Sequence, residues 1–529
     1  MLGIATLKWP RAIAAAMLGI AMVWSGWPLA TTEASDACPD LQSAIDGAAS
    51  GATVVVPDCD FRVTLMLDRP ITLRAPAGAM IDGSDVWTAW DGRRSLATVP
   101  ALVAVDACST QQSACADRRR VWLDGAQLRS VEADPSSGEF AIDSSGHVLL
   151  GDDPAGRLVE VVVRETWLFV NASDVTVEGF TMRNASNAPQ TGAVRVKSGV
   201  SRFTLRDCDL GYAAGANVSI GVANDSVIEN CDIHHGGQLG VHLGGDGTNG
   251  YGNVLRNNNI HDNNTAGFDP EWEAGGVKAT RQTGLKMTGN TVSGNVGPGL
   301  WCDIYCRDIV VSDNRIYHNT HAGIFFEVST GAKIANNRIW ENGWSKASWG
   351  WGAGILISSS GGADVSGNIV AWNYVGISVL SQNRQDWSHS ATDNNVHDNV
   401  VIAEGDRYAV IWAQDWSGVL WNASSNNRGA NNRYWVNSAE DGRRRFAWQG
   451  DKGSLSAFNT TPAENAGSYL TDSQKRTILS DAGMPPGSDL VRPEDPVLRG
   501  VLVGLAAAAL LLLAIASIAR LRRRRRNRP

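Results

Sequence analysis

Two acidic side chains, Asp303 and Glu327, occupy the same place in two copies of one short phrase. Each is the fourth residue after a glycine, in Gly299-Leu300-Trp301-Cys302-Asp303 and in Gly323-Ile324-Phe325-Phe326-Glu327. If the copies stack as neighbouring parallel strands, their backbones lie about 5 Å apart and the two carboxylates are neighbours. Carboxylates that close repel each other, so one has a raised pKa unless a cation lies between them.

Lys278 and His242 are the second residues after the glycine in two preceding copies, so we expect them on adjoining coils of the same face. Three chemistries fit these four residues, which we predict to be catalytic. A carboxylate pair about 5–5.5 Å apart suits a retaining glycosidase. A calcium ion, the one candidate cofactor, would use both carboxylates as ligands. Lys278 or His242 as general base beside that cation would give β-elimination or epimerisation. The alternative is an acidic surface without a catalytic role.

Five further residues are predicted to bind a substrate on this face. Trp301 and Phe325 occupy the second position of their copies, Glu271 and Glu273 lie in an irregular segment just before the Lys278 strand, and His321 precedes its glycine. Thirteen of the 20 tryptophans fall between residues 272 and 448. Indole faces stack on sugar rings, although several of these tryptophans are expected to pack against the core instead. A sugar polymer is the predicted ligand.

The element that positions these residues is an internal repeat. An Asn-x-aliphatic phrase followed by a further polar residue, usually Asn, starts at Asn258, Asn290, Asn314, Asn337, Asn368 and Asn394. Its copies are broken by Gly and Asn turns and show period-2 alternation without helical periodicity, which predicts short strands. Two or three strands in about 23 residues form one coil, and stacked coils bury a continuous core. Within each copy the second and fourth residues after the glycine then point outward.

With these coils the chain resembles the right-handed parallel β-helix family, the pectate-lyase-like fold, over roughly residues 41–437. Leu41-Gln42-Ser43-Ala44-Ile45 resembles the helix that caps the first coil of that family. The resemblance implies an all-β, right-handed parallel β-helix solenoid. The polygalacturonase motifs are missing, and the only Asp-Asp pair, Asp152-Asp153, lies where the repeat is interrupted. No family catalytic residue can therefore be transferred.

The two ends of the chain indicate export and tethering. Lys8 and Arg11 precede a short apolar run, residues 12–23, as in a signal peptide. An uncleaved N-terminal anchor is the alternative. Residues 500–519 are uncharged and long enough for a transmembrane helix, and the arginines that follow place the tail in the cytoplasm. The expected organisation is a signal peptide (1–37), cap and first coils (38–85), a small inserted β subdomain (86–164), β-helix (165–437), polar stalk (438–499), transmembrane helix (500–519) and Arg-rich tail (520–529).

Charge and cysteine content limit the partners. The formal net charge is −8, but seven arginines lie in the last ten residues, and the region between the two charged ends carries about −17. So acidic a region argues against nucleic acid as a binding partner. Eight cysteines in an exported chain favour disulfides over a metal cluster. The candidate pairs are Cys38 with Cys59, Cys108 with Cys115, Cys208 with Cys231 and Cys302 with Cys306; for Cys208 and Cys231, stacked free thiols are an equal alternative.

The sequence thus predicts an exported, membrane-tethered enzyme of lyase or glycoside hydrolase type acting on an extracellular polysaccharide. The alternative is a non-catalytic glycan-binding or structural protein of the cell surface.

Overall fold

The computed structural model describes residues 38–76, 78–102, 118–244, 247–345, 349–384, 391–437 and 445–488. The expected signal peptide, the segment 500–519, the Arg-rich tail and the Cys108–Cys115 pair lie outside these residues. Within the described residues no helix combines the length and apolar character needed to cross a membrane.

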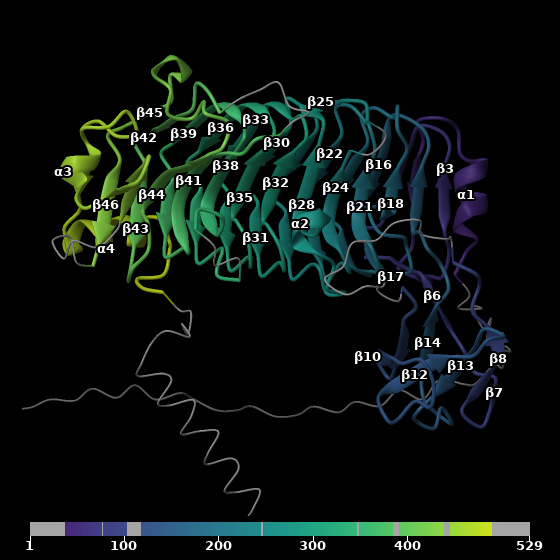
Figure 1. Ribbon diagram of the computed structural model, residues 1–529. Helices are drawn as coiled ribbons and strands as arrows, with labels where there is room; N and C mark the ends of the chain where they lie inside the picture. Colours follow the sequence, from purple (N-terminus) through teal and green to yellow (C-terminus); the bar gives the residue numbers. More distant parts are fainter. Residues whose placement is uncertain are drawn as a thin grey trace, which may run out of the picture. The chain divides into compact units, whose positions relative to one another are not determined.

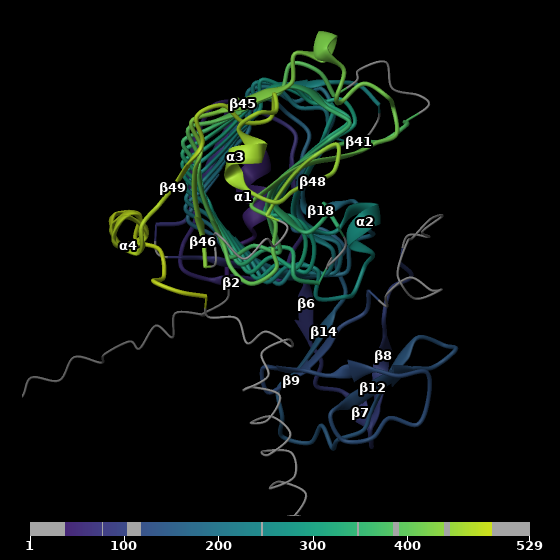
Figure 2. The ribbon, with the colours of Figure 1, turned by 60° about the vertical axis from the view of Figure 1, so that its left-hand side comes forward.

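Three long parallel sheets form the body of the described chain and wind around one core (Figures 1 and 2). Sheet 1 consists, in order, of β1 (Thr53–Val55), β4 (Ile71–Arg74), β16 (Val175–Glu178), β19 (Thr204–Arg206), β22 (Val227–Glu229), β26 (Val254–Arg256), β30 (Lys286–Thr288), β33 (Arg307–Ser312), β36 (Thr330–Ala335), β39 (Gly361–Ser366), β42 (Asn395–His397) and β45 (Arg428–Ala430), with β25 (Gly250–Tyr251) and β29 (Gln282–Thr283) beside this path.

Sheet 2 consists of β2 (Asp60–Phe61), β5 (Met80–Asp82), β17 (Thr181–Ala185), β20 (Asp209–Ala213), β23 (Asp232–His234), β27 (Asn259–His261), β31 (Thr291–Ser293), β34 (Arg315–Tyr317), β37 (Arg338–Trp340), β40 (Ile369–Ala371), β43 (Val400–Ala403), β46 (Arg433–Val436) and β49 (Ser468–Tyr469). Sheet 3 consists of β3 (Leu65–Leu67), β15 (Leu168–Val170), β18 (Gly192–Val196), β21 (Ala216–Ile220), β24 (Leu239–Leu243), β28 (Gly275–Thr280), β32 (Leu300–Asp303), β35 (Ile324–Glu327), β38 (Ala353–Ser358), β41 (Val375–Ser381), β44 (Val410–Asp415), β47 (Phe446–Trp448) and β48 (Asp451–Lys452). Each coil contributes one strand to each sheet, as a parallel β-helix requires.

The repeat glycines are explained by the close approach of neighbouring coils. A Cβ atom on Gly299 would lie 2.7 Å from the carbonyl oxygen of Gly323, and one on Gly323 would lie 2.8 Å from that of Gly354. Real Cβ atoms do not come this near to a carbonyl oxygen. Glycine therefore lets each coil settle against the next at the start of its sheet 3 strand.

Buried asparagines connect the coils at the turn before sheet 2. The Oδ1 of each accepts from the side-chain amide of the asparagine one coil earlier, in the series Asn258, Asn290, Asn314, Asn337, Asn368, Asn399 and Asn432. Asn394, the start of the last expected copy, belongs instead to the turn before β42 of sheet 1 and bonds to Asn427. The phrase recurs five residues later as Asn399-Val400-Val401, which is the copy in phase with the others, so Asn394 lies one strand earlier in its coil.

Short helices cover both ends of the core (Figure 1). Helix α1 (Leu41–Gly47) begins at Asp40, whose carboxylate accepts the Ser43 N–H, and buries Leu41 and Ile45. Helix α3 (Leu455–Phe458) buries its apolar residues in the same core cluster. Residues 445–488, expected to lie in a polar stalk, thus end the fold, and α4 (Asp472–Asp481) packs through Leu479 against the outer face of sheet 2.

The interruption of the repeat is a small β subdomain. One sheet contains β10 (Ala126–Gln127), β9 (Val121–Leu123), β14 (Val159–Val162) and β6 (Ser84–Val86); the other contains β11 (Arg129–Ser130), β12 (Glu139–Ile142), β13 (His147–Leu150), β8 (Arg94–Thr98) and β7 (Trp90–Asp91). It has a core of its own around Phe140 and Val148. The remaining elements are α2 (Pro270–Glu273) and a 3-10 turn, η1 (Ala423–Ser425).

The cysteines divide into disulfide-bonded and free residues. Cys38 and Cys59 are disulfide-bonded, in agreement with the sequence. Four cysteines are free and buried: Cys208, Cys231, Cys302 and Cys306. The predicted Cys302–Cys306 disulfide is therefore wrong. For Cys208 and Cys231, the second of the two expected alternatives, stacked free thiols, is the one present. The thiols of Cys208, Cys231 and Cys306 lie near backbone carbonyl oxygens inside the core. Cys306 Sγ, for example, is 3.6 Å from the carbonyl oxygens of both Ala279 and Asp303, either of which can accept its hydrogen bond.

Candidate active site

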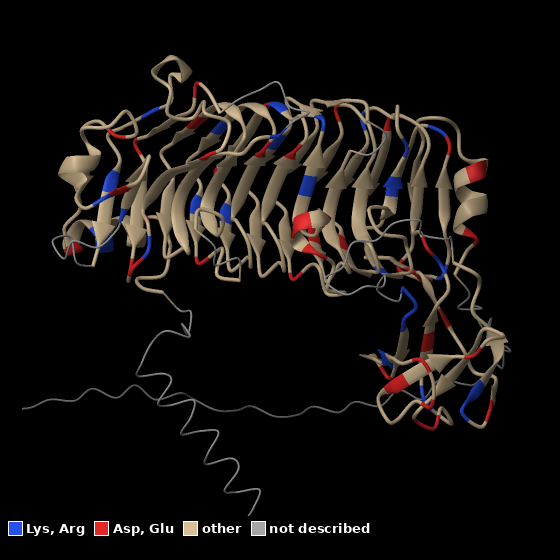
Figure 3. Ribbon diagram, in the orientation of Figure 1, with Lys and Arg blue, Asp and Glu red and all other residues tan. Residues whose placement is uncertain are grey.

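The outward-facing ladder expected on the coils is present on sheet 3. Strand register aligns His242, Lys278, Trp301, Phe325, Leu356 and Ser378 on consecutive strands. All six are buried, although they lie on the outer face of the sheet. Helix α2, whose N-cap is Asp269 and whose first residue is Pro270, lies over this face and brings acidic residues to it (Figure 3).

Lys278 is held in place on both sides. Its Nζ donates to Asp303 Oδ2 at 2.7 Å and lies 3.0 Å from the centre of the Trp301 ring. Only 1% of the residue is exposed. An ammonium group that is paired, stacked and covered in this way is a poor general base for an incoming substrate, so the expected role of Lys278 as base is not supported by its surroundings.

The Asp303 carboxylate is also occupied. Oδ2 accepts from Lys278, and Oδ1 accepts the backbone N–H of Ile304 at 2.7 Å. Asp303 lies under the neighbouring side chains and is not among the residues that line the adjoining pocket. The spacing of the repeat had predicted that Asp303 and Glu327 face a sugar or a calcium ion together. In the structure only Glu327 of the two lines the pocket.

Glu327 lies at the wall of a pocket of about 350 Å³. Its Oε1 accepts from Arg384 Nη1 at 3.0 Å. Burial, and then the negative charge of Asp303, raise the pKa of Glu327 to about 7, while Lys278 and Arg384 act in the opposite direction. A carboxyl group that titrates near neutrality inside a pocket is suited to give and accept protons.

Aromatic and polar groups form the remaining walls. Trp301 has one face against Lys278 and the other stacked on Phe325 at 5.1 Å, so both of its faces are occupied and it offers a pocket only its edge. The predicted stacking of a sugar on Trp301 is therefore not supported. The lining consists of Pro270, Glu271, Pro298, Trp301, His321, Ala322, Phe325, Glu327, Trp351, Leu356, Gln382 and Arg384. Trp351, from the tryptophan-rich segment 344–351, supplies an indole to this wall.

His321 and Glu271 reach the same pocket, as predicted from their places beside the repeat. Burial lowers the pKa of His321 to about 4, so its imidazole is neutral at neutral pH. Its Nδ1 lies 3.0 Å from Thr320 Oγ1. Glu271, the second residue of α2, brings a second carboxylate to the pocket that Glu327 lines.

His242 and Glu273, the last residue of α2, do not line the Glu327 pocket. The His242 Nε2 is 3.6 Å from Glu273 Oε2, which accepts from Gln190 Nε2 at 2.7 Å. Burial lowers the pKa of His242 to about 4, helped by the charge of Lys278, and burial raises the pKa of Glu273. His242 lines a second pocket, of about 690 Å³, over β15, β18, β21 and β24. The four residues predicted to be catalytic are thus divided between two pockets and the buried pair between them.

Three site residues were missed from the sequence. Arg384 lies 57 residues after Glu327, in the segment following β41, and Gln382 lies beside it. Gln190 reaches Glu273 from the segment before β18. None of the three belongs to a repeated phrase, so the periodicity of the sequence gave no signal for them. The one hint for Arg384 is its position shortly after Ser378, the last residue of the ladder.

Comparisons with known proteins agree with the fold. Residues 192–370 match the family described as right handed beta helix region. The complex of XylC with xylose aligns with a TM-score of 0.56 at 15% identity, over 81% of this chain and 82% of that one. The A-module of the Azotobacter vinelandii mannuronan C-5 epimerase AlgE6 aligns with a TM-score of 0.42 at 14% identity, over 81% and 94% of the two chains. Lid-free DFA-IIIase of Arthrobacter chlorophenolicus A6 aligns with a TM-score of 0.38 at 13% identity, over 78% and 88%.

The family match and the XylC alignment establish a right-handed parallel β-helix, as the sequence predicted, and do not establish an activity. A search of curated protein sequences finds no match to the chain.

Proposed function

We propose that this β-helix protein is a polysaccharide-active enzyme whose reaction takes place in the Glu327 pocket, with Glu327 as the acid/base residue. The carrying observation is the Glu327 carboxyl itself, which is buried, has a pKa of about 7 and opens on a pocket with aromatic walls. The disulfide at Cys38 and Cys59 supports an exported enzyme, and its substrate is then an extracellular glycan.

Protonated Glu327 would donate its proton to the glycosidic oxygen as that bond breaks, and ionised Glu327 would accept one in the opposite step. Two carboxylates line the pocket, so Glu271 is the candidate partner of Glu327 in a hydrolase. Asp303 keeps a positioning role, because its negative charge raises the pKa of Glu327. Trp351 and Phe325 offer apolar surface to a sugar ring.

Arg384 supports the lyase form of the same proposal. Its guanidinium is 39% exposed while it contacts Glu327, so it can also reach a carboxylate on a substrate. In a uronate polymer the paired carboxylate makes the neighbouring C–H more acidic, and a base at Glu327 or neutral His321 would accept that proton. Arg195 and Lys197, which line the second pocket of sheet 3, add positive charge along the same face of an otherwise acidic protein.

A panel of neutral and uronate polysaccharides, assayed in parallel for new reducing ends and for unsaturated products by ultraviolet absorbance, tests the proposal. Reducing ends without unsaturation identify a hydrolase, and both together identify a lyase. The Glu327→Gln variant should lose at least about 100-fold in turnover, the ordinary contribution of acid/base catalysis. Glu132→Gln, at an exposed position of the inserted subdomain, is the matched control and should retain full activity.

Turnover that survives in Glu327→Gln at the level of Glu132→Gln would refute the assignment of Glu327. The alternative, a glycan-binding surface without catalysis, predicts that a polysaccharide binds and is recovered intact, with equal affinity in both variants.

A further inference from the structure

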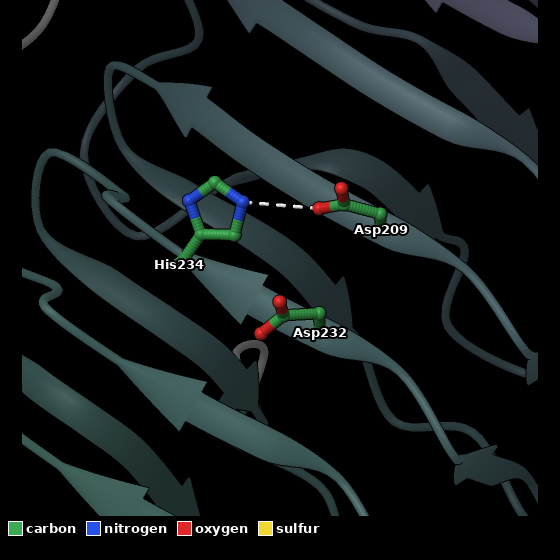
Figure 4. Close-up of side chains that lie close together, drawn as sticks. All are labelled: Asp209, Asp232 and His234. Atoms are coloured by element: carbon green, nitrogen blue, oxygen red, sulfur yellow. Dashed lines mark hydrogen bonds and ion pairs between the residues drawn. The ribbon is translucent and has the colours of Figure 1, made fainter. Parts of the chain in front are cut away.

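Sheet 2 carries a cluster of imidazoles and carboxylates away from the proposed active site. Asp232 and His234 are two residues apart on β23, so both side chains leave the same face of the strand. Register places Asp209 of β20 beside Asp232, and His261 of β27 beside His234. Three neighbouring coils thereby bring two carboxylates and two imidazoles to one place, and Figure 4 shows Asp209, Asp232 and His234 of this set.

The distances join these groups into one set. His234 Nε2 lies 3.0 Å from Asp209 Oδ1, and His261 Nε2 lies 2.9 Å from Asp232 Oδ1. One ligand atom each from Asp209, Asp232 and His234 fall within 4.8 Å of one another, the span of a single coordination sphere. The two imidazole rings stack at 5.3 Å with an angle of 22° between them.

Each ring has a polar group at both nitrogens. His261 has a carboxylate oxygen at each, with Asp262 Oδ2 2.7 Å from Nδ1 and Asp232 Oδ1 2.9 Å from Nε2. His234 Nδ1 lies 2.7 Å from His235 Nδ1. If His234 donates its proton there, its Nε2 is unprotonated and can ligate a cation beside Asp209 and Asp232.

Neighbouring residues hold the three groups in place. His261 contacts Asp232 through Nε2 and Asp262 through Nδ1, and so orients the Asp232 carboxylate, as second-sphere partners of metal ligands do. Arg183 holds both oxygens of Asp209, at 2.9 and 2.6 Å, which orients that carboxylate. Gly211 makes room for His234, because a Cβ there would lie 2.5 Å from its Cε1.

We propose that Asp209, Asp232 and His234 bind one divalent transition-metal ion of the zinc class, which links two neighbouring coils of sheet 2. Imidazole nitrogens favour such ions over calcium or magnesium, which prefer all-oxygen sites. The site adjoins the inserted subdomain, since Tyr212 stacks on the neighbouring His235 and meets Trp122 of β9 edge to face. The ion would therefore stabilise the coils on which the subdomain rests, independently of any catalysis.

The test uses the purified chain without an affinity tag, stripped of metal with a chelator and titrated with Co²⁺ and Zn²⁺. We expect one ion per chain, visible Co²⁺ absorption of a four-coordinate site, displacement of Co²⁺ by Zn²⁺, and no displacement by equimolar Ca²⁺. His234→Gln and Asp232→Asn should each lower the affinity at least about 10-fold. Zinc at about 100 times the wild-type Kd should raise the Tm of the wild type by more than that of the variants.

His397→Gln is the matched control. His397 also lies between two carboxylates, with Asp364 at 2.7 Å and Asp398 at 2.6 Å, but its strand neighbours are Ser366 and Ala430 rather than a second histidine. It should bind Co²⁺ as the wild type does. Equal Tm values of all chains in chelator would show that the variants fold. An absence of Co²⁺ binding by the wild type, or equal losses in His397→Gln and His234→Gln, would overturn the site.

Discussion

The Lys278 ammonium donates to the Asp303 carboxylate at 2.7 Å on adjacent strands of sheet 3, with 1% of Lys278 and 5% of Asp303 exposed. In a buried pair of this kind, either charge without its partner would be strongly destabilising. The pair lies directly beneath the Glu327 pocket, and Asp303 raises the pKa of Glu327. The two residues thus connect the stability of the coils with the proposed chemistry.

Replacing Lys278 by methionine leaves the Asp303 charge buried and unpaired. We expect Lys278→Met to lower the free energy of unfolding by about 3–5 kcal/mol, and Lys278→Met with Asp303→Leu to recover most of that loss, since the second change removes the stranded charge. Urea denaturation followed by far-ultraviolet circular dichroism measures both. Arg202→Met, which breaks the exposed pair with Asp174, should leave the midpoint unchanged. A double variant no more stable than Lys278→Met would contradict this account.

The raised pKa of Glu327 makes stability depend on pH. Because the carboxyl is harder to ionise in the folded chain than in the unfolded one, its contribution to stability falls as the pH rises from about 4.5 to about 7, and is then constant. Glu327→Gln cannot ionise, so its stability relative to the wild type should increase across that window. Urea midpoints at several pH values measure the difference. Glu132→Gln should follow the wild type throughout, and a flat difference for Glu327→Gln would rule out the raised pKa.

Arg384 lowers the pKa of Glu327. Its replacement by glutamine should therefore shift the pH inflection of turnover upward, while the inflection should vanish in Glu327→Gln. The pH profile of kcat/KM measures the shift, which a merely structural role of Arg384 would not produce. Arg338→Gln, on β37 of sheet 2, provides the control. An unchanged or lowered inflection in Arg384→Gln would mean that the guanidinium does not lower the pKa of Glu327.

The buried Asn394, in the turn before β42, has a matched control in the adjacent Asn395. Asn394 accepts the Ala363 N–H at 3.0 Å and donates to Ser360 O at 3.0 Å, whereas Asn395 points to the outer face of sheet 1 and is half-buried. Asn394→Ala leaves those buried groups without partners, each costing about 1–3 kcal/mol. Chemical denaturation should show a loss of several kcal/mol for Asn394→Ala and little change for Asn395→Ala. Similar losses in both variants would argue against a stabilising role of the buried Asn394 amide.

Much of the fold follows from the order of residues. The repeated glycines and asparagines, the spacing of 23 to 32 residues and the period-2 alternation predict stacked parallel strands and the register of the ladder from His242 to Ser378. Local rules suffice there, because each coil repeats the contacts of the last. The same rules misplaced Asn394 by one strand, because the turn before sheet 1 carries the same Asn-x-aliphatic phrase there.

Which outward side chains stay accessible was decided by the tertiary structure. Alternation places Lys278, Asp303 and Glu327 on the outer face, but Lys278 and Asp303 are buried in their ion pair. Glu327 is left at a pocket to which α2 and the segments after β37 and β41 contribute walls. Arg384 reaches Glu327 across 57 residues. The course of such non-repeating segments depends on long-range packing, which periodicity does not encode. Composition and repeat therefore determined the β-helix by themselves, and only the packing of its irregular segments selected the charged groups that can meet a ligand.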